Sequence, residues 1–218
     1  MKSRSETIKE FFAAAHAGEV EQVRQMLQRD PSLNQAEDAD CFQYRALNIA
    51  VWRNNRPLVD VVLDSGVDID AFDSFESGPW NALQHALNHH HLEMAEYLVE
   101  RGAAIDVHSA AGLPRMGRLA QLLEADPSLI QARGGDGKMP LHFAANPEVA
   151  AFLLERGAEI EARDLDHFST PAQWAADHRP AVSRFLVGKG AEPDIFMAVS
   201  SGDLSWVLEM IQKKPDVL

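Results

Sequence analysis

The sequence predicts an all-α solenoid of about seven helix-turn-helix repeats. One pattern recurs along the 218 residues: a helix of small residues, a turn, a second apolar helix, and a Gly or Pro stop. Gly66 and Gly102 are 36 residues apart, and Gly157 and Gly190 are 33 residues apart. A period in this range is typical of solenoids, in which each repeat packs mainly on its neighbours. The clearest copies of the ending are residues 63–71, 98–106 and 153–162.

The fifth repeat shows why each element is expected. Gly137 makes a turn, and Pro140 stands in the first turn of the next helix, where its missing N–H leaves no bond unmade. Residues 144–145 are both alanine, which lets neighbouring helices pack closely. A second helix over residues 148–156 carries apolar side chains at helical spacing. Gly157 then supplies the left-handed residue that ends it.

This pattern resembles the ankyrin repeat, whose signature is a turn, Thr-Pro-Leu-His, two alanines, a second helix and Gly-Ala before the next hairpin. The best matches are residues 139–145 and 170–176, and residues 45–51 and 81–87 are degenerate copies. The resemblance covers nearly the whole chain, and several copies in register make it specific. It implies short hairpin fingers and one domain over residues 1–218. The repeats are expected at about residues 6–37, 38–71, 72–105, 106–133, 134–162, 163–193 and 194–218.

The copies are of two types. Copies one and four end in Asp-Pro-Ser-Leu, at residues 30–33 and 126–129, and copy seven has a related ending at residues 214–218; the others are of the Gly-Ala type. In copy five only two residues separate Ala145 from the second helix, so we expect a short first helix and a notch in the surface. Because the sequence stops at Leu218, where another hairpin would begin, we expect either a capping repeat or a longer chain.

Composition narrows the class of protein. The net charge is −13, from 33 acidic and 20 basic residues, which would repel the phosphates of nucleic acid. No run approaches the roughly 18 apolar residues of a membrane span, and residues 1–6 lead into no apolar signal-peptide stretch. The single cysteine, Cys41, excludes an internal disulfide and a Cys-rich zinc site. We therefore expect a soluble cytoplasmic monomer that binds neither nucleic acid nor membranes.

The sequence contains no catalytic motif: there is no Gly-rich phosphate loop, no Gly-x-Ser-x-Gly elbow and no His-Glu-x-x-His. Cys41 is interpreted as a small turn residue rather than a nucleophile. His85 and His89 could share a metal ion on one helix face, but packing of His85 between repeats is the preferred interpretation. The resemblance implies that His142 bonds the backbone of the neighbouring turn. We therefore predict that the protein is not an enzyme and has no catalytic residue, metal site or cofactor.

Aromatic residues gather in one stretch, because six of the 16 lie between positions 42 and 80. Aromatic and Arg side chains in an exposed patch commonly form binding hot spots. The other interpretation is that large residues in copies two and three fill gaps left by missing Pro and His. The resemblance implies partner contacts at the hairpin tips, before the Thr position and after the two alanines. The predicted partner-binding residues are Phe42, Tyr44, Trp52, Arg53, Phe75, Trp80, Asn88, His89, Lys138, Asn146, Asp166, His167, Asp177 and His178.

The sequence thus predicts a non-catalytic module that binds a protein partner, through a basic or apolar surface of that partner, on its concave face. Trp52 and Trp80 would anchor the partner. Two alternatives stay open. One is a small-molecule or enzymatic pocket near the copy-five notch, with His85, His89 and His178. The other is the regulatory arm of a longer protein.

Overall fold

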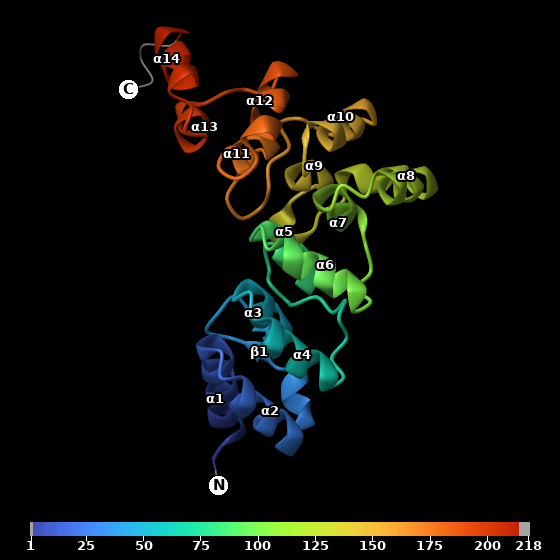
Figure 1. The fold of residues 1–218 in the computed structure, drawn as a ribbon, viewed down its shortest axis with the longest axis vertical. Coiled ribbons are helices and arrows are strands. Elements are labelled where there is room, and N and C mark those ends of the chain that lie inside the picture. Colours follow the sequence, from blue (N-terminus) through green and yellow to red (C-terminus); the bar gives the residue numbers. More distant parts are fainter. Residues whose placement is uncertain (1, 214–218) are drawn as a thin grey trace. The chain divides into compact units, whose positions relative to one another are not determined.

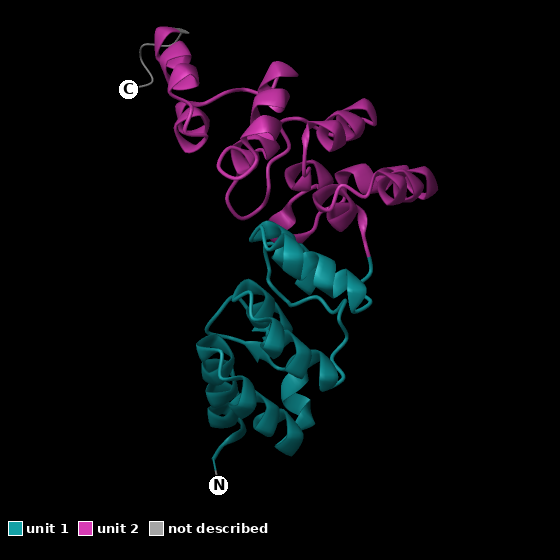
Figure 2. Cartoon of the chain, in the orientation of Figure 1, with its two compact units in different colours: residues 1–104 teal, residues 105–218 magenta. Residues whose placement is uncertain are grey.

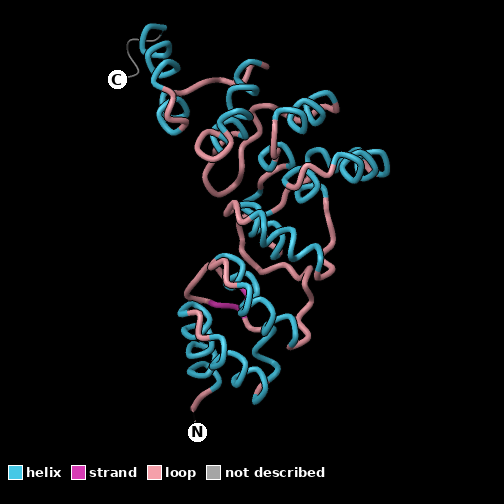
Figure 3. The backbone as a smooth tube through the Cα atoms, viewed as in Figure 1, coloured by secondary structure: helices cyan, strands magenta, loops and turns pink. Residues whose placement is uncertain are grey.

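The computed structural model describes residues 2–213, and the chain divides into two compact units, residues 1–104 and residues 105–218 (Figures 1 and 2). Helices and the loops that join them make up nearly all of both units (Figure 3). The predicted all-α class of paired helices is confirmed. The prediction of one domain over residues 1–218 stays a prediction.

Unit 1 contains three helix pairs and one two-stranded hairpin, in which β1 pairs antiparallel with β2. The hairpin lies between the first and second pairs along the chain. The elements are α1 (Arg4–Ala17), α2 (Val20–Arg29), the 3-10 helix η1 (Pro31–Gln35), β1 (Glu37–Asp38), β2 (Tyr44–Arg45), α3 (Ala46–Trp52), α4 (Arg56–Asp64), α5 (Ala82–Asn88) and α6 (Leu92–Glu100).

Unit 2 contains four helix pairs and two 3-10 helices among its described residues. The pairs follow one another along the chain, with a loop before each first helix. The elements are α7 (Val107–Gly112), α8 (Met116–Ala125), η2 (Pro127–Gln131), η3 (Gly135–Gly137), α9 (Pro140–Phe143), α10 (Pro147–Glu155), α11 (Pro171–Ala175), α12 (Pro180–Gly188), α13 (Ile195–Ser200) and α14 (Leu204–Lys213).

Local signals set the helix ends. Ser3 and Glu6 form a capping box at the start of α1, in which each side chain bonds the backbone N–H of the other residue. Thr170 and Gln173 form the same box at the start of α11. At the C-terminal side, Gly102 has a φ of 103° beyond α6, a left-handed conformation that glycine adopts without strain. The Gly stops that the sequence predicts therefore act as helix terminators.

The Asp-Pro-Ser-Leu copies end in another way. Asp30 Oδ1 accepts a hydrogen bond from the N–H of Ser32 (3.1 Å), and η1 follows α2 directly. Asp126 and Ser128 repeat this bond at 2.9 Å before η2. The proline between them starts the 3-10 helix and cannot continue the preceding α-helix. The related ending predicted at residues 214–218 lies outside the described residues.

Each unit has an apolar core with alanines at the helix contacts. Ala50 and Ala86 in unit 1 and Ala144 in unit 2 are completely buried, so the helices beside them approach closely. Within residues 2–213 no helix is both long enough and apolar enough to cross a membrane. The large side chains that are fully buried include Phe11, Ile49, Leu58, Leu83 and Leu98 in unit 1, and Leu119, Leu141, Leu153, Leu186 and Met197 in unit 2.

Copy five has the short first helix that its sequence predicts. Helix α9 spans four residues, whereas α3 and α5 span seven residues each. The Ala144 carbonyl beyond its end accepts a hydrogen bond from Arg179 Nη1 at 2.9 Å. Burial lowers the pKa of Arg179 to about 10. The Arg179 side chain thus reaches into the region where the notch is predicted and satisfies a carbonyl that the shortened helix leaves free.

Candidate functional site

The hairpin of unit 1 presents an aromatic side chain to solvent. Asp38 in β1 lies opposite Tyr44 in β2, and the turn between them holds Phe42 and Gln43 at positive φ values of 51° and 58°. The N–H of Gln43 bonds the Asp38 carbonyl (3.0 Å), and the N–H of Tyr44 bonds the Cys41 carbonyl (3.0 Å). Left-handed conformations are uncommon outside glycine and persist where surrounding bonds enforce them. The turn leaves the Phe42 side chain 58% exposed.

Five side chains of unit 1 form a surface that we call the aromatic cluster: Phe42, Tyr44, Trp52, Phe75 and His89. The Phe42 ring centroid lies 5.7 Å from that of Phe75 and 5.5 Å from that of Tyr44. The chain of rings continues from Tyr44 to Trp52 (6.3 Å) and from Trp52 to His89 (6.2 Å). These separations are typical of favourable tilted and edge-to-face aromatic pairs. Phe42 is exposed and the other four residues are partly exposed.

Arg53 and His85 flank this cluster. The exposed Arg53 guanidinium lies 5.2 Å from the centroid of the Trp52 ring, a cation–π contact. The His85 ring is parallel to that of His89 within 8° at 5.8 Å, and it meets Tyr44 edge-on at 4.5 Å. His85 is 1% exposed, so it packs inside unit 1 as the preferred interpretation predicted.

A buried carboxylate holds Trp80 in the core of unit 1. Asp73 accepts hydrogen bonds from the N–H of Trp80 (2.9 Å) and from Asn48 Nδ2 (2.8 Å). Asn48 also donates to the Trp80 carbonyl at 3.1 Å. The Trp80 ring lies 5.1 Å from that of His85 and is 1% exposed. The prediction that Trp80 contacts a partner is therefore wrong, because its side chain is buried beside His85 and fills space in the core.

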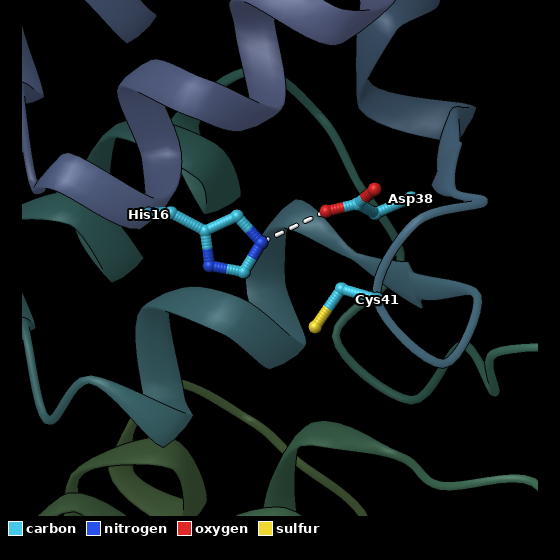
Figure 4. A group of neighbouring side chains, drawn as sticks. All are labelled: His16, Asp38 and Cys41. Atoms are coloured by element: carbon cyan, nitrogen blue, oxygen red, sulfur yellow. Dashed lines mark hydrogen bonds and ion pairs between the residues drawn. The ribbon is translucent and has the colours of Figure 1, made fainter.

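His16, Asp38 and Cys41 meet beside the hairpin of unit 1 (Figure 4). His16 Nε2, from α1, donates to Asp38 Oδ2 at 2.8 Å. One potential ligand atom of each residue lies within 4.8 Å of the other two. Burial raises the pKa of the Cys41 thiol, and Asp38 raises it further, while Arg53 opposes them. A nucleophilic cysteine needs a lowered pKa, so these surroundings favour the thiol and argue against nucleophilic catalysis by Cys41.

In unit 2 the histidine of the fifth repeat is neutral. His142 Nδ1 accepts a hydrogen bond from the N–H of Met139 (3.1 Å), so its proton is on Nε2, which donates to the Ser169 carbonyl (3.2 Å). Burial lowers the pKa of His142 to about 4. The side chain thus joins α9 to the hairpin before α11, which is the role that the resemblance implies.

Asp164 organises that second hairpin. Its carboxylate accepts hydrogen bonds from the N–H groups of Asp166 (3.0 Å), His167 (2.6 Å) and Ser169 (2.9 Å). Trp174 Nε1 donates a fourth bond at 2.7 Å. Burial of Asp164 opposes its ionisation, but the bonds from these donors prevail and lower its pKa. One buried carboxylate therefore fixes the path of the whole hairpin.

Lys138 is buried in unit 2, and the prediction that it contacts a partner is wrong. Its ammonium lies 3.4 Å from the centroid of the Trp174 ring and 3.2 Å from Asp136 Oδ2. The side chain is 3% exposed. Burial lowers the pKa of Lys138 to about 8, although Asp136 acts in the opposite direction. The ammonium is held by these internal contacts and is not presented to solvent.

The remaining predicted residues keep part of their surface open to solvent. Asn146 Oδ1 accepts a bond from the N–H at the third position of α10 (2.9 Å), so this side chain caps a helix. His167 Nδ1 lies 3.4 Å from Asp166 Oδ2, and His178 Nε2 lies 3.0 Å from Asp177 Oδ2. Unit 2 therefore presents two acid–histidine pairs. The set comprises Asn88 in unit 1 and Asn146, Asp166, His167, Asp177 and His178 in unit 2.

Sequence reasoning missed the three buried hairpin carboxylates, Asp38, Asp73 and Asp164. Each accepts a hydrogen bond from the N–H two residues later, at 3.1, 3.3 and 3.0 Å respectively. An aspartate that bonds the backbone two residues on is a recurring turn former. The available signal is their position, six to eight residues before the N-cap residues Arg45, Asn81 and Thr170.

A cavity of about 390 Å³ lies in unit 2 apart from the predicted contacts. Thr170, Asp194 and Met210 are among the residues that line it. None of the predicted partner-binding residues lines this cavity, so it does not correspond to the alternative pocket with His85, His89 and His178.

Comparison with known proteins identifies ankyrin repeats in part of the chain. Residues 73–164 match the family model of ankyrin repeats, with three copies. Ankyrin repeats are therefore present at residues 73–164. The predicted resemblance to this family is therefore confirmed, as is the all-α ankyrin-repeat fold. Ankyrin repeats are in general protein–protein interaction modules that do not catalyse reactions.

Two further proteins resemble this chain. The ankyrin repeat and SAM domain-containing protein 6 of Rattus norvegicus is 24% identical over 149 residues, which cover 62% of this chain and 17% of that protein. The chain therefore matches about a sixth of that relative. Among solved structures, a complex of a predatory endopeptidase from Bdellovibrio bacteriovorus with an immunity protein contains a similar chain. The TM-score is 0.46 and the identity 20%, covering 87% of this ankyrin-repeat chain and 100% of the other.

Proposed function

We propose that this ankyrin-repeat chain is a non-catalytic recognition module and that the aromatic cluster of unit 1 contacts its protein partner. The observation that carries the proposal is the unbroken series of accessible rings from Phe75 to His89. Aromatic and Arg side chains supply a large share of the binding energy at interfaces. Contiguous exposed apolar surface of this kind marks contact sites in soluble proteins.

The surroundings of the cluster suggest the chemistry of the partner. The rings would receive an apolar side chain, with Trp52 at the centre and Arg53 beside it. Asp40 and Glu76 are exposed near the two hairpin turns that carry Phe42 and Phe75. Basic groups of the partner would therefore meet these carboxylates, and the overall charge of −13 would favour the approach of such a partner.

The exposed residues of unit 2 belong to the proposal in a secondary role. The pairs Asp166–His167 and Asp177–His178 are accessible and carry polar groups that would adjust specificity. Asn88 and Asn146 are partly exposed and would act in the same way. Exposed polar contacts at the rim of an interface contribute little binding energy each. We therefore expect the aromatic cluster to dominate the affinity.

The test compares two double variants of the full chain. Phe42→Ala with Trp52→Ala removes the centre of the cluster, whereas Phe168→Ala with Phe196→Ala removes two exposed aromatic side chains of unit 2. The wild-type chain is used to capture partners, and the affinity of each purified partner is then measured by calorimetry. We expect the Phe42/Trp52 variant to bind at least about 30-fold more weakly, as removal of a hot spot does. The Phe168/Phe196 variant should bind like the wild type.

Circular dichroism and thermal unfolding establish that both variants are folded. Unchanged affinity of a folded Phe42/Trp52 variant would show that the partner binds elsewhere on the chain. Equal loss in both variants would show that exposed aromatic area in general, and not this cluster, governs binding. Phe42 and Phe168 form a matched pair because both have a positive φ, 51° and 56°, and both are exposed.

A further inference from the structure

We propose that His16, Asp38 and Cys41 bind a divalent transition-metal ion, with zinc as the ion that suits these ligands best. The inference is independent of protein recognition. The three residues come from α1, from β1 and from the turn that follows β1, so folding of unit 1 brings them together (Figure 4). One imidazole nitrogen, one carboxylate oxygen and one thiol sulfur lie within 4.8 Å of one another.

The set of ligand types favours zinc. Imidazole, thiolate and carboxylate are the three side-chain ligands that zinc uses in proteins, whereas magnesium and calcium prefer oxygen ligands alone. A single thiolate with nitrogen and oxygen suits a borderline ion. The chain has one cysteine, and it is this residue that stands beside the histidine and the aspartate. Three protein ligands would leave the fourth position of a tetrahedral ion for water or for a group from another molecule.

The distances need only a small adjustment. Ligand atoms at tetrahedral angles and ordinary zinc distances lie roughly 3.4–3.6 Å apart. The His16–Asp38 hydrogen bond of 2.8 Å would open to this value, and the other separations would shorten from at most 4.8 Å. These changes amount to about 1 Å, which side-chain rotation can supply. The proton that His16 shares with Asp38 would move to the other ring nitrogen, and the thiol would lose its proton to solvent.

Comparison of the hairpin carboxylates distinguishes this site from an ordinary turn. Asp164 accepts four N–H donors, so its lone pairs are used. Within residues 2–213, Asp38 Oδ1 accepts only the N–H of Asp40 (3.1 Å), and Oδ2 accepts only His16. The Asp38 side chain is 10% exposed, so water has little access to the remaining lone pairs. The thiol of Cys41 makes no hydrogen bond to any residue in the described range 2–213.

Within residues 2–213, the other group of three possible ligand residues lacks these properties. Asp136, Asp166 and His167 are also within reach of one another, but Asp136 is already paired with Lys138 at 3.2 Å. His167 and Asp166 are exposed neighbours in sequence. A nearby ammonium opposes cation binding, and exposed side chains cost entropy to fix. The proposal is therefore confined to His16, Asp38 and Cys41.

The experiment uses cobalt as a coloured substitute for zinc. The metal-free full chain is titrated with Co²⁺ and its absorption recorded. We expect a stoichiometry of one ion per chain, a near-ultraviolet thiolate-to-cobalt charge-transfer band, and intense visible bands of a four-coordinate ion. Zn²⁺ should displace the cobalt and bleach these bands. A spectrum like that of hydrated cobalt, without the thiolate band, would overturn the proposal.

Variants assign the ligands. Cys41→Ser and His16→Gln should each lower the Zn²⁺ affinity by at least about a hundredfold, because even changes outside the ligand set cost 10–100-fold. His178→Gln removes an exposed histidine of unit 2 and should leave the affinity unchanged. Equal affinity of wild type and Cys41→Ser would show that the ion binds at other side chains and would reject the site.

One measurement needs no variant and decides the case if a substitution prevents folding. Saturating Zn²⁺ should slow alkylation of Cys41 in the wild-type chain by at least about tenfold and raise the Tm, because an ion that binds only the folded state stabilises it. Alkylation at the same rate with and without Zn²⁺ would reject coordination by the thiol.

Discussion

The hairpin at residues 38–45 and the hairpin at residues 164–169 share a design but differ in their contacts. Each begins at a buried aspartate and raises a phenylalanine with positive φ, Phe42 (58% exposed) and Phe168 (67% exposed). Asp164 accepts four N–H donors, whereas the Asp38 carboxylate accepts two. Phe42 has two aromatic neighbours, and Phe168 has none within the described part of the chain.

The difference indicates that the hairpin of unit 2 stabilises the fold, whereas the hairpin of unit 1 has polar and aromatic groups available for other contacts. In unit 2 the polar groups of the hairpin are used in holding its own path. In unit 1 the aspartate keeps unused lone pairs, and the aromatic side chain joins an accessible surface. Exposure alone does not distinguish the two, because Phe168 is more exposed than Phe42. The neighbours of each side chain carry the distinction.

The largest expected effect is the loss of stability when Asp164, rather than Asp38, is replaced by alanine. Asp164→Ala would remove the acceptor of four hydrogen bonds and should lower the free energy of unfolding by about 4 kcal/mol, about 1 kcal/mol for each bond. Asp38→Ala leaves two donors, one of them on a partly exposed histidine, and should cost about 1 kcal/mol. Urea unfolding of both variants measures the two costs. Equal costs would mean that the number of donors is not what separates the hairpins.

A second prediction uses the pH dependence of unit 2. The pKa of His142 is about 4 in the folded chain and about 6.5 in the unfolded chain, so between these values only the unfolded chain takes up the proton. Stability should therefore be unaffected by His142 above pH 6.5 and fall by up to about 3 kcal/mol as the pH drops from 6.5 to 4. The lowered pKa of Asp164 acts in a lower window, below pH 3.8.

The measurement is the free energy of unfolding between pH 7 and pH 4, for the wild type and for His142→Gln. The variant should lose most of the slope in this window, because glutamine does not titrate. If the slope persists, another group is responsible for it. A lost slope would show that the buried histidine of α9, which is bonded to the hairpin of unit 2 through the Ser169 carbonyl, stays neutral in this pH range.

The smallest effect concerns the two phenylalanines. Phe42→Ala loses aromatic contacts with Tyr44 and Phe75 and should destabilise the chain by about 1 kcal/mol. Phe168→Ala loses only exposed surface and should change stability by less than about 0.5 kcal/mol. Both replace a phenylalanine at positive φ, so the backbone cost is matched. Thermal unfolding monitored by circular dichroism resolves the two. A larger loss for Phe168 would refute the assignment of contacts.

Much of the fold could be predicted from short segments. Pro140, Thr170 and Gly102 act through the conformation of their own backbone or of the adjacent turn, so their positions predicted the helix ends. The shortness of α9 followed from the two residues between Ala145 and the next helix. The role of His142 came from the family pattern, and its hydrogen bonds agree with it.

Burial of the candidate residues could not be predicted in the same way. Trp80 and Lys138 occupy positions that vary between ankyrin repeats, and the resemblance placed both on the surface. The Trp80 side chain is buried beside the His85 ring, while Asp73 and Asn48 bind its backbone. Lys138 is buried because the Trp174 ring and Asp136 receive its ammonium. The partners of Lys138 differ from repeat to repeat, so a pattern shared by the repeats does not contain them.

The repeated helix pairs, their Gly and Pro stops and the gathering of aromatic residues between positions 42 and 80 follow from the amino-acid sequence alone. These depend on local backbone preference and on spacing along the chain. Packing of the folded chain sets which of those residues are accessible, and it brings His16 to Asp38 and Cys41. His16 and Asp38 are 22 residues apart, and such a distance is closed only when helix α1 packs against the hairpin.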